Sequence, residues 1–227
     1  MKAIALIPAY NEADLVGATV EAVCALSDVE KVVLIDDGST DGTDKVGRRA
    51  GACVLRLERN GGKGAALAHG IASLEAPWPD AVLLLDADLG ASAREAKTLL
   101  APIAAGLADM TVGVLPKPPG SGGFGVVVNL ARGAIREWGG GYDAQAPLSG
   151  QRALSWECLQ AVLPFAEGYG VEVALTIRAL KQHYRVLEVM VDMRHRATGR
   201  DLPGFLHRAR QYLDVRRTIK ALAQKET

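Results

Sequence analysis

The sequence predicts an α/β protein with an open, mostly parallel sheet flanked by helices. Apolar runs typical of buried strands alternate with segments of helical periodicity, an order that gives parallel strands joined by crossover helices. A chain of 227 residues can bury a sizeable core, and this length suits one domain. Each of the first four apolar runs ends in a polar turn, and in an open α/β sheet ligands bind at that edge.

The individual elements follow from the same patterns. Strands are expected where short apolar runs occur, at 3–8, 31–36, 53–57, 81–86, 110–114 and 185–191. Helices are expected where the spacing is helical, at 12–25, 43–50, 63–75, 92–105, 125–137, 170–182 and from 202 onward. A Pro- and Gly-rich loop at 116–125 separates the two halves of the chain.

Charge and cysteine content exclude several classes of protein. The 26 basic and 26 acidic residues cancel, so no overall field favours nucleic acid as a partner. Cys24, Cys53 and Cys158 are odd in number, widely spaced and set among apolar residues, which is typical of reduced thiols rather than disulfides or a zinc site. No apolar run reaches the roughly 18 residues of a membrane span. We therefore expect a cytoplasmic protein.

The stretch "VLLLDADLG" (82–90) ends a buried run on two carboxylates. If the strand geometry continues, Asp86 and Asp88 point to the same side. Adjacent carboxylates repel each other unless they share a cation, and oxygen ligands of this kind suit Mg²⁺ or Mn²⁺, which bridge to substrate phosphates. The pair predicts half of a metal–diphosphate site; the alternative is a solvated strand end.

Two further turns carry polar residues suited to a nucleotide. "NGGKGAA" places Lys63 among glycines at a helix start, where backbone N–H groups and the helix dipole favour an anion. "DDGSTDGT" places Asp36 and Asp37 at a strand end, where either can accept a hydrogen bond from a nucleobase or ribose. The alternatives are an exposed lysine in a glycine-rich turn, and a turn in which Thr40 or Asp41 caps the next helix.

Four motifs in this order, "IPAYNE", "IDDGSTDGT", "RNGGKGAAL" and "LLLDADL", resemble the family 2 glycosyltransferases of GT-A (Rossmann-like) fold, which include polyprenyl-phosphate sugar synthases. The resemblance implies a single domain over 1–227, with a nucleotide-sugar-binding half at 1–115 and an acceptor-binding half at 116–227. It also implies that Asp88 ligates Mg²⁺ or Mn²⁺. The residues that it implies for binding a UDP- or GDP-sugar are Pro8, Ala9, Tyr10, Glu12, Asp37, Lys63 and Asp86.

The second half resembles a narrower group. "PFAEGYGVEVAL" (164–175) followed by "MRHR" (193–196) is similar to glucosyl-3-phosphoglycerate synthases, which implies that Glu172 is a catalytic-site carboxylate and His195 a metal ligand. "PLSGQRAL" (147–154) is similar to the acceptor-side segment of family 2 enzymes. The acceptor-side residues that this similarity implies are Ser149, Gly150, Gln151 and Arg152.

The chain also departs from both groups. Gly90 stands where polyprenyl-phosphate synthases commonly carry a glutamine, which removes one metal ligand and makes His195 more necessary. Phe124 and Val126 are apolar where the phosphoglycerate enzymes bind their acceptor with polar residues. The acceptor therefore stays open between polyprenyl phosphate and a small phosphorylated or hydroxylated molecule.

The expected mechanism follows from these residues. The metal and Lys63 would stabilise charge on the nucleoside diphosphate leaving group. A hydroxyl acceptor in an inverting reaction needs a general base, for which Asp143 and Glu167 are candidates, whereas a phosphate acceptor needs none. Glu172 would instead hold the acceptor hydroxyl in a retaining reaction, so the stereochemical outcome stays open.

The C-terminal segment combines an apolar stripe with positive charge. The apolar residues are Phe205, Leu206, Ala209, Leu213 and Leu222, and the basic ones are Arg208, Arg210, Arg216, Arg217 and Lys220. We expect the stripe to pack on the protein with a solvated basic face; the alternative is a peripheral contact with the inner, anionic face of a membrane. A homodimer also stays open.

Three other classes share part of this pattern. A haloacid-dehalogenase-type phosphatase carries its DxD motif on the first strand, and a nucleotidyltransferase carries a Gly-rich, Arg-containing loop after that strand; neither arrangement occurs here. A non-catalytic sugar-nucleotide sensor would keep the nucleotide motifs without the acceptor residues. Asp143, Gln151, Arg152 and Glu172 argue against a sensor.

Overall fold

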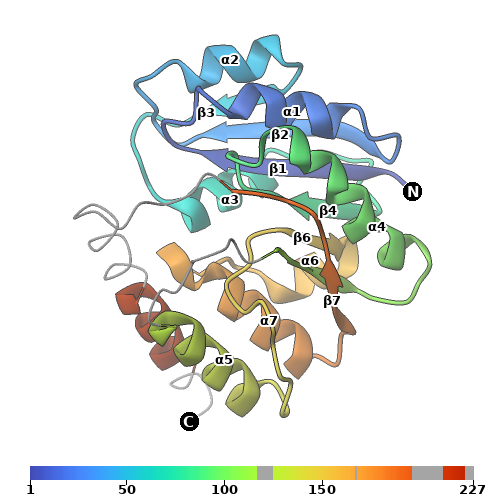
Figure 1. Ribbon diagram of the computed structural model, residues 1–227, viewed down its shortest axis with the longest axis vertical. Coiled ribbons are helices and arrows are strands. Elements are labelled where there is room, and N and C mark those ends of the chain that lie inside the picture. Colours follow the sequence, from blue (N-terminus) through green and yellow to red (C-terminus); the bar gives the residue numbers. More distant parts are fainter. Residues whose placement is uncertain (117–124, 167, 196–211, 223–227) are drawn as a thin grey trace.

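The computed structural model describes residues 1–116, 125–166, 168–195 and 212–222, and within them both halves of the chain build one seven-stranded sheet (Figure 1). The strands are β1 (Ala3–Ala9), β2 (Val29–Asp36), β3 (Cys53–Arg56), β4 (Ala81–Leu84), β5 (Met110–Val114), β6 (Arg152–Ser155) and β7 (Val186–Met190). The α-helices are α1 (Val16–Cys24), α2 (Thr43–Arg49), α3 (Lys63–Ala72), α4 (Ala96–Ala104), α5 (Val126–Trp138), α6 (Trp156–Val162) and α7 (Val171–Lys181). Two 3₁₀ turns, η1 (Gly90–Glu95) and η2 (Gly168–Gly170), and an unlabelled helix over 212–222 complete the description.

The strands lie in the order β3-β2-β1-β4-β6-β5-β7. Only β6 is antiparallel to its neighbours, β4 and β5, among the strands that the structure describes. Arg152, at the start of β6, lies opposite Leu84, at the end of β4. The reversed strand therefore brings the segment before Arg152 to the carboxyl ends of the parallel strands.

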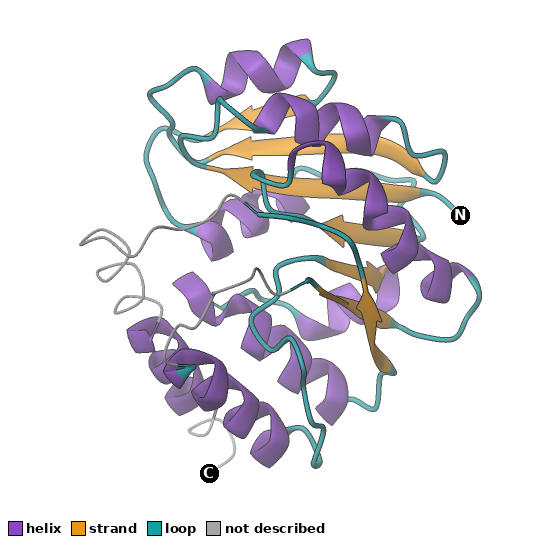
Figure 2. Ribbon diagram, in the orientation of Figure 1, coloured by secondary structure: helices purple, strands orange, loops and turns teal. Residues whose placement is uncertain are grey.

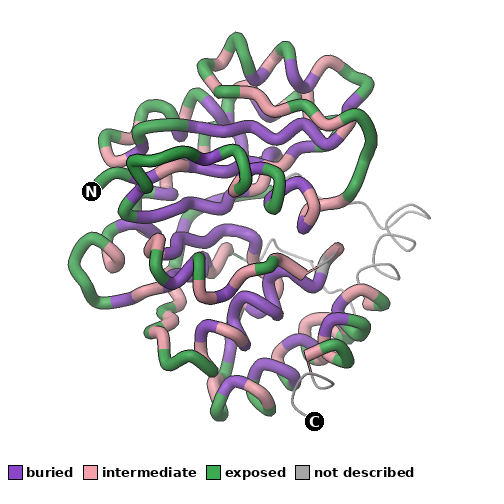
Figure 3. Tube along the Cα trace, turned by 180° about the vertical axis from the view of Figure 1, so that it is seen from behind, coloured by how far each residue is buried: buried purple, intermediate pink, exposed green. Residues whose placement is uncertain are grey.

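Helices cover both faces of the sheet (Figure 2). Alternate side chains of β1 point to opposite faces, so Ile7 packs with α1 and α4 in one core cluster while Leu6 packs with α3, α6 and α7 in another. A third cluster joins α5, α7 and the helix over 212–222. Because both faces are covered, the central strands are buried along most of their length (Figure 3).

The predicted fold class is confirmed, with differences in individual elements. The expected strand over 81–86 ends at Leu84, and the expected helix over 92–105 consists of η1 followed by α4. β6 and α6 were not expected, because "RALS" is a short run next to a mixed helical pattern and carries no clear period. No helix in the described parts of the chain is both long and apolar enough to cross a bilayer.

Candidate functional site

The loops that follow β1 and β2 are joined by hydrogen bonds between side chains and backbone. The backbone N–H of Asn11 donates to Ser39 Oγ at 2.9 Å, and that of Thr40 donates to Asn11 Oδ1 at 2.9 Å. The backbone N–H of Glu12 donates to Thr43 Oγ1 at 2.9 Å. The "PAYNE" and "DDGSTDGT" turns thus form one structure, with Pro8 and Ala9 at the end of β1 and Tyr10 half exposed beside them.

Asp37 holds the loop that leads to Lys63. Its two carboxylate oxygens accept the backbone N–H groups of Gly61 and Gly62, both at 2.8 Å, and the side chain is almost fully buried. A Cβ on Gly38 would meet the Arg59 backbone at 2.9 Å, so the two loops are in close contact. The carboxylate predicted to bind the nucleotide therefore contacts protein backbone, and it fixes the start of α3.

Lys63 joins two carboxylates from distant parts of the chain. Its Nζ lies 2.6 Å from Asp86 Oδ1 and 2.8 Å from Glu172 Oε1. Glu172 stands in the first turn of α7, where the helix dipole favours a negative charge. Burial alone would lower the pKa of Lys63, but the charges of Asp86 and Glu172 outweigh it and raise that pKa above its usual value. Lys63 is therefore a cation at neutral pH.

The segment before β6 completes this cluster from the other side. Gln151 is fully buried; its Nε2 donates to Asp86 Oδ2 at 2.5 Å, and its Oε1 accepts the Asp86 backbone N–H at 3.0 Å. Gly150 lies so close that a Cβ there would be 2.3 Å from Lys63 Nζ and 2.8 Å from both Asp86 carboxylate oxygens. Gly150 and Gln151, predicted on the acceptor side, thus contact the DAD motif directly.

Asp88 and His195 form the exposed side of the same cluster. His195 Nδ1 lies 2.9 Å from Asp88 Oδ1, its Nε2 lies 3.8 Å from Asp86 Oδ2, and the same nitrogen lies 3.4 Å from Gln151 Nε2. Burial would lower the pKa of His195, but the hydrogen bond with Asp88 and the charge of Asp86 raise it overall. The strand geometry expected for Asp86 and Asp88 does not continue, because both lie beyond the end of β4, yet His195 bridges the two carboxylates.

Arg152 is buried next to this cluster. Its Nε donates to Ser149 O at 2.9 Å and its Nη1 to Thr176 Oγ1 at 2.8 Å. Burial lowers the pKa of Arg152 to about 10, against the opposing charges of Glu172 and Glu188, so it remains a cation at neutral pH. Arg152, predicted on the acceptor side, supports the loop through its hydrogen bond to Ser149 O.

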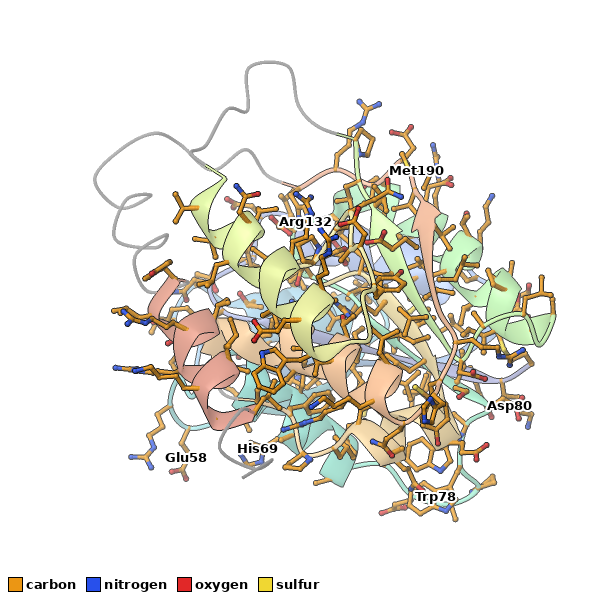
Figure 4. All side chains as sticks on the ribbon, turned by 90° about the horizontal axis from the view of Figure 1, so that it is seen from below. Glu58, His69, Trp78, Asp80, Arg132 and Met190 are labelled. Atoms are coloured by element: carbon orange, nitrogen blue, oxygen red, sulfur yellow. The ribbon has the colours of Figure 1, made fainter. Side chains whose placement is uncertain are left out.

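The loop after α5 is held from two sides. Glu188 on β7 accepts the backbone N–H groups of Gln145 and Ala146 at 2.9 and 2.7 Å. Arg132 on α5, which Figure 4 shows between that helix and the neighbouring loop, donates from Nε to Ala144 O at 2.7 Å. These contacts hold residues 144–146, the segment that leads to Ser149 and Gly150.

Of the predicted candidate bases, Asp143 lies outside the cluster in the described part of the chain. Asp143 is exposed in the loop after α5, and within the described residues no hydrogen bond or ion pair links it to Asp86, Asp88 or Lys63. Glu167 and Phe124 lie outside the described residues. Of the predicted C-terminal stripe, 205–209 also lies outside them, whereas Leu213 is exposed and Leu222 packs against the third core cluster.

Sequence reasoning missed Arg56. From β3 it lies 3.6 Å from Asp36 Oδ2 and 3.3 Å from Asp44 Oδ2, and its Nη2 donates to Ser39 O at 3.0 Å. Arg56 thereby holds the "DDGST" turn through its contacts with Asp36 and Ser39. The only sequence signal was a basic residue inside a short apolar strand, which alone is also typical of an edge strand.

The chain is similar to known glycosyltransferases. The family model for glycosyl transferase family 2 matches residues 4–149. Glycosyltransferase AglJ of Haloferax volcanii is 30% identical over 205 residues, which cover 86% of this chain and 64% of that protein. Glucosyl-3-phosphoglycerate synthase of Mycobacterium tuberculosis is 32% identical over 200 residues, which cover 76% of this chain and 59% of that protein.

Solved structures agree with these matches. The crystal structure of the Mycobacterium tuberculosis glucosyl-3-phosphoglycerate synthase in complex with Mg²⁺ and uridine diphosphate has a TM-score of 0.80 at 25% identity. The match covers 97% of this chain and 78% of that one. The sheet is thus the predicted GT-A sheet. This chain spans less than two thirds of the length of each of the two curated relatives named above. With the family model matching residues 4–149, the chain belongs to glycosyl transferase family 2.

Proposed function

We propose that this chain transfers a hexosyl group from a UDP-sugar to an acceptor, with Mg²⁺ or Mn²⁺ bound beside the diphosphate. The observation that carries this proposal is the convergence of Lys63, Asp86, Asp88 and His195 at the carboxyl ends of the parallel strands. Ligands of open α/β sheets bind at this edge. The solved relatives in complex with uridine diphosphate and Mg²⁺, or with Mn²⁺ and UDP-glucose, support the choice of donor.

The side chains fit such a metal ion. Carboxylate oxygen and imidazole nitrogen suit Mn²⁺, and Mg²⁺ is commonly held by one or two carboxylates together with substrate phosphates. Lys63 Nζ lies beside Asp86 and Glu172, and Asp88 lies beside His195, so a divalent cation held by Asp88 and His195 would add positive charge next to three carboxylates. We assign Asp88 and His195 as the ligands, since both side chains are partly exposed. When bound, the ion supplies positive charge to the diphosphate leaving group.

The remaining residues orient the substrate. Lys63, fixed by two carboxylates, donates to the diphosphate oxygens as negative charge develops there, which is preorganised electrostatic catalysis. Asp86 fixes Lys63 and contacts the ribose or donor sugar. Glu172 touches Lys63 and orients the acceptor. Asp37 contributes through the Gly61–Gly62 loop.

The acceptor is proposed as a phosphorylated molecule. A solved relative is in complex with phosphoglyceric acid, which supports a small phosphorylated acid as one candidate. The motifs of the first half, which resemble polyprenyl-phosphate sugar synthases, keep a polyprenyl phosphate as the other candidate. The two candidates share the phosphate and differ in the apolar chain.

A panel of UDP-, GDP- and dTDP-sugars, each with and without Mn²⁺, tests the donor site by thermal shift and by transfer to either acceptor. A ligand that binds only the folded chain raises the melting temperature. We expect a shift for a UDP-sugar that requires Mn²⁺ and is lost in Asp88→Ala. Asp80→Asn is the matched control, because Asp80 lies before β4, at its opposite end, and holds the Lys2 backbone N–H.

Two results would overturn the proposal. One is a metal-dependent shift and turnover that persist in Asp88→Ala. The other is the absence of any shift with every sugar nucleotide, which would favour a reaction or a binding function unrelated to the DAD motif.

A further inference from the structure

The turn that carries Asp88 is held by a buried hydroxyl on another element. Thr19 on α1 is fully buried, and its Oγ1 lies 2.8 Å from Ala87 O, with Leu15 O as a second acceptor at 3.1 Å. The same oxygen accepts the backbone N–H of Gly90 at 2.8 Å. One side chain therefore satisfies a carbonyl before Asp88 and an amide after it.

A second hydroxyl links this turn to the segment that carries His195. Ser92 Oγ donates to Leu89 O at 2.6 Å and accepts the backbone N–H of Arg194 at 3.0 Å. Leu89 directly follows Asp88, and Arg194 directly precedes His195. The two segments joined by the 2.9 Å contact between Asp88 and His195 are therefore also joined by Ser92, which binds a backbone group of each.

These bonds matter because the turn has no strand to support it. β4 ends at Leu84, four residues before Asp88, and Gly90 adopts a positive φ of 53° that favours glycine. A metal ligand must be held close to its productive geometry, and loops hold side chains less well than strands or helices. Side chains that orient ligands without touching the ion typically change metal affinity by about 10- to 100-fold when removed.

We propose that Thr19 and Ser92 are positioning residues that set the placement of Asp88 and His195 for the divalent cation. Thr19 fixes the backbone on both sides of Asp88, and Ser92 fixes the distance between that turn and His195. This inference rests on the proposed function, because it assumes that Asp88 and His195 hold the metal.

The test compares the Mn²⁺ dissociation constant of the variants, measured by electron paramagnetic resonance with and without UDP. Thr19→Val keeps the shape of the side chain and removes the hydroxyl, and Ser92→Ala does the same at a half-buried site that tolerates the change more easily. We expect each to weaken Mn²⁺ binding by about tenfold or more. Thr19→Ser should restore most of the affinity, because it restores the hydroxyl.

Two matched controls separate positioning from general stability. Thr111→Val removes another fully buried hydroxyl, which lies 2.8 Å from Leu99 O and joins β5 to α4. Ser73→Ala removes a hydroxyl that donates to Gly70 O at 2.7 Å, three residues back, as Ser92 does to Leu89. Both controls should lower the melting temperature without changing the Mn²⁺ dissociation constant.

Amide hydrogen exchange in the absence of metal gives an independent readout. The Gly90 amide should exchange faster in Thr19→Val, and the Arg194 amide should exchange faster in Ser92→Ala, because each loses its acceptor. If Thr19→Val does not fold, Ser92→Ala decides the matter alone.

The outcomes are distinct. Unchanged Mn²⁺ affinity in both Thr19→Val and Ser92→Ala, with normal binding by the wild-type chain, overturns this inference and leaves the proposed function intact. The same loss of affinity in the Thr111→Val and Ser73→Ala controls overturns it as well, because the effect would then be one of stability. A wild-type chain that binds neither Mn²⁺ nor UDP overturns the proposed function and this inference together.

Discussion

Gly150 shows how a single missing side chain shapes the site. The position directly contacts the ion pair of Lys63 and Asp86, so a methyl group there would overlap Lys63 Nζ at 2.3 Å. The same methyl group would lie 2.8 Å from both carboxylate oxygens of Asp86. These oxygens are held by Lys63 and Gln151. These atoms are the ends of side chains, so relieving the overlap requires Lys63 Nζ and the Asp86 carboxylate to shift from the positions that they hold in the ion pair.

We therefore predict that Gly150→Ala weakens Mn²⁺-dependent binding of UDP by about tenfold or more, since small misplacements of binding groups are costly. Isothermal titration of UDP in the presence of Mn²⁺ measures this change. Gly133→Ala is the control: Gly133 lies within α5 with open space around its Cα, and alanine there should stabilise the helix by up to about 1 kcal/mol. Equal UDP affinity in Gly150→Ala and the wild-type chain would contradict the prediction.

Residue identity alone could predict the members of the cluster but not their partners. Motifs identify the DAD aspartates, Lys63 and Glu172, and they predict Gln151 on the acceptor side, but they do not predict its two hydrogen bonds with Asp86. Asp37 is likewise predicted at the nucleotide site, but the motif does not predict that its carboxylate accepts two backbone N–H groups. Motifs indicate which side chains converge; the direction of each depends on loop geometry, which has no sequence period.

At the scale of elements, the strand missed by sequence analysis is the one that connects the two halves. β6 has four residues, and it pairs antiparallel with both β4 and β5. Alternating strand and helix patterns predict parallel pairing, so a reversed strand inserted between two others leaves no signal in a local window. The parallel part of the sheet was predictable because each strand is buried on both faces and carries a continuous apolar run.

A polar pair aligns β5 with β7. Arg185, just before β7, donates from Nε and Nη2 to the two carboxylate oxygens of Asp109, just before β5, at 2.9 and 2.8 Å. The hydrogen bonds from Arg185 hold the pKa of Asp109 below its usual value. Because the folded pKa is below the unfolded one, the pair stabilises the fold above the unfolded pKa, and this contribution is lost as pH falls through the folded pKa.

We predict that Asp109→Asn lowers the free energy of unfolding by about 1 kcal/mol near neutral pH, a modest value because the arginine is largely exposed. The difference from the wild-type chain should shrink as pH falls below about 4, where the unfolded carboxyl titrates. Urea denaturation between pH 2 and 7 measures this trend. Glu30→Gln, which removes a looser and more exposed pair with Lys2 at 3.9 Å, should change little at any pH. A difference between Asp109→Asn and wild type that grows on acidification would contradict the assignment.

At the scale of the whole molecule, the site depends on segments from nearly the full length of the chain. Lys63, Asp86, Gln151, Glu172 and His195 come from five separate segments that meet only in the assembled sheet. The helix over 212–222 packs against the turn that precedes Glu172, because a Cβ on Gly170 would overlap Thr218 Oγ1. Packing far from the sheet therefore supports a carboxylate within the site.

The described part of the C-terminal helix packs on the protein itself. Val215 is fully buried and packs with α5 and α7 in the third core cluster, whereas Leu213 on the same helix is 47% exposed. Arg216, Arg217 and Lys220 face solvent. Most of the apolar side of the described helix is thus buried against the protein, as expected for a helix packed on its own fold.

We predict that Val215→Ala lowers the free energy of unfolding by roughly 1–3 kcal/mol, since it leaves a cavity between three helices. Leu213→Ala, a larger truncation on the exposed side, should cost less than about 0.5 kcal/mol. Urea denaturation of both variants compares their free energies of unfolding. Binding of both variants to vesicles of anionic lipid tests whether the exposed side of the helix contacts a membrane. A Leu213→Ala variant that keeps its stability but loses vesicle binding would show that the exposed side meets a membrane. Equal destabilisation by the two changes would mean that the helix does not bury Val215 in solution.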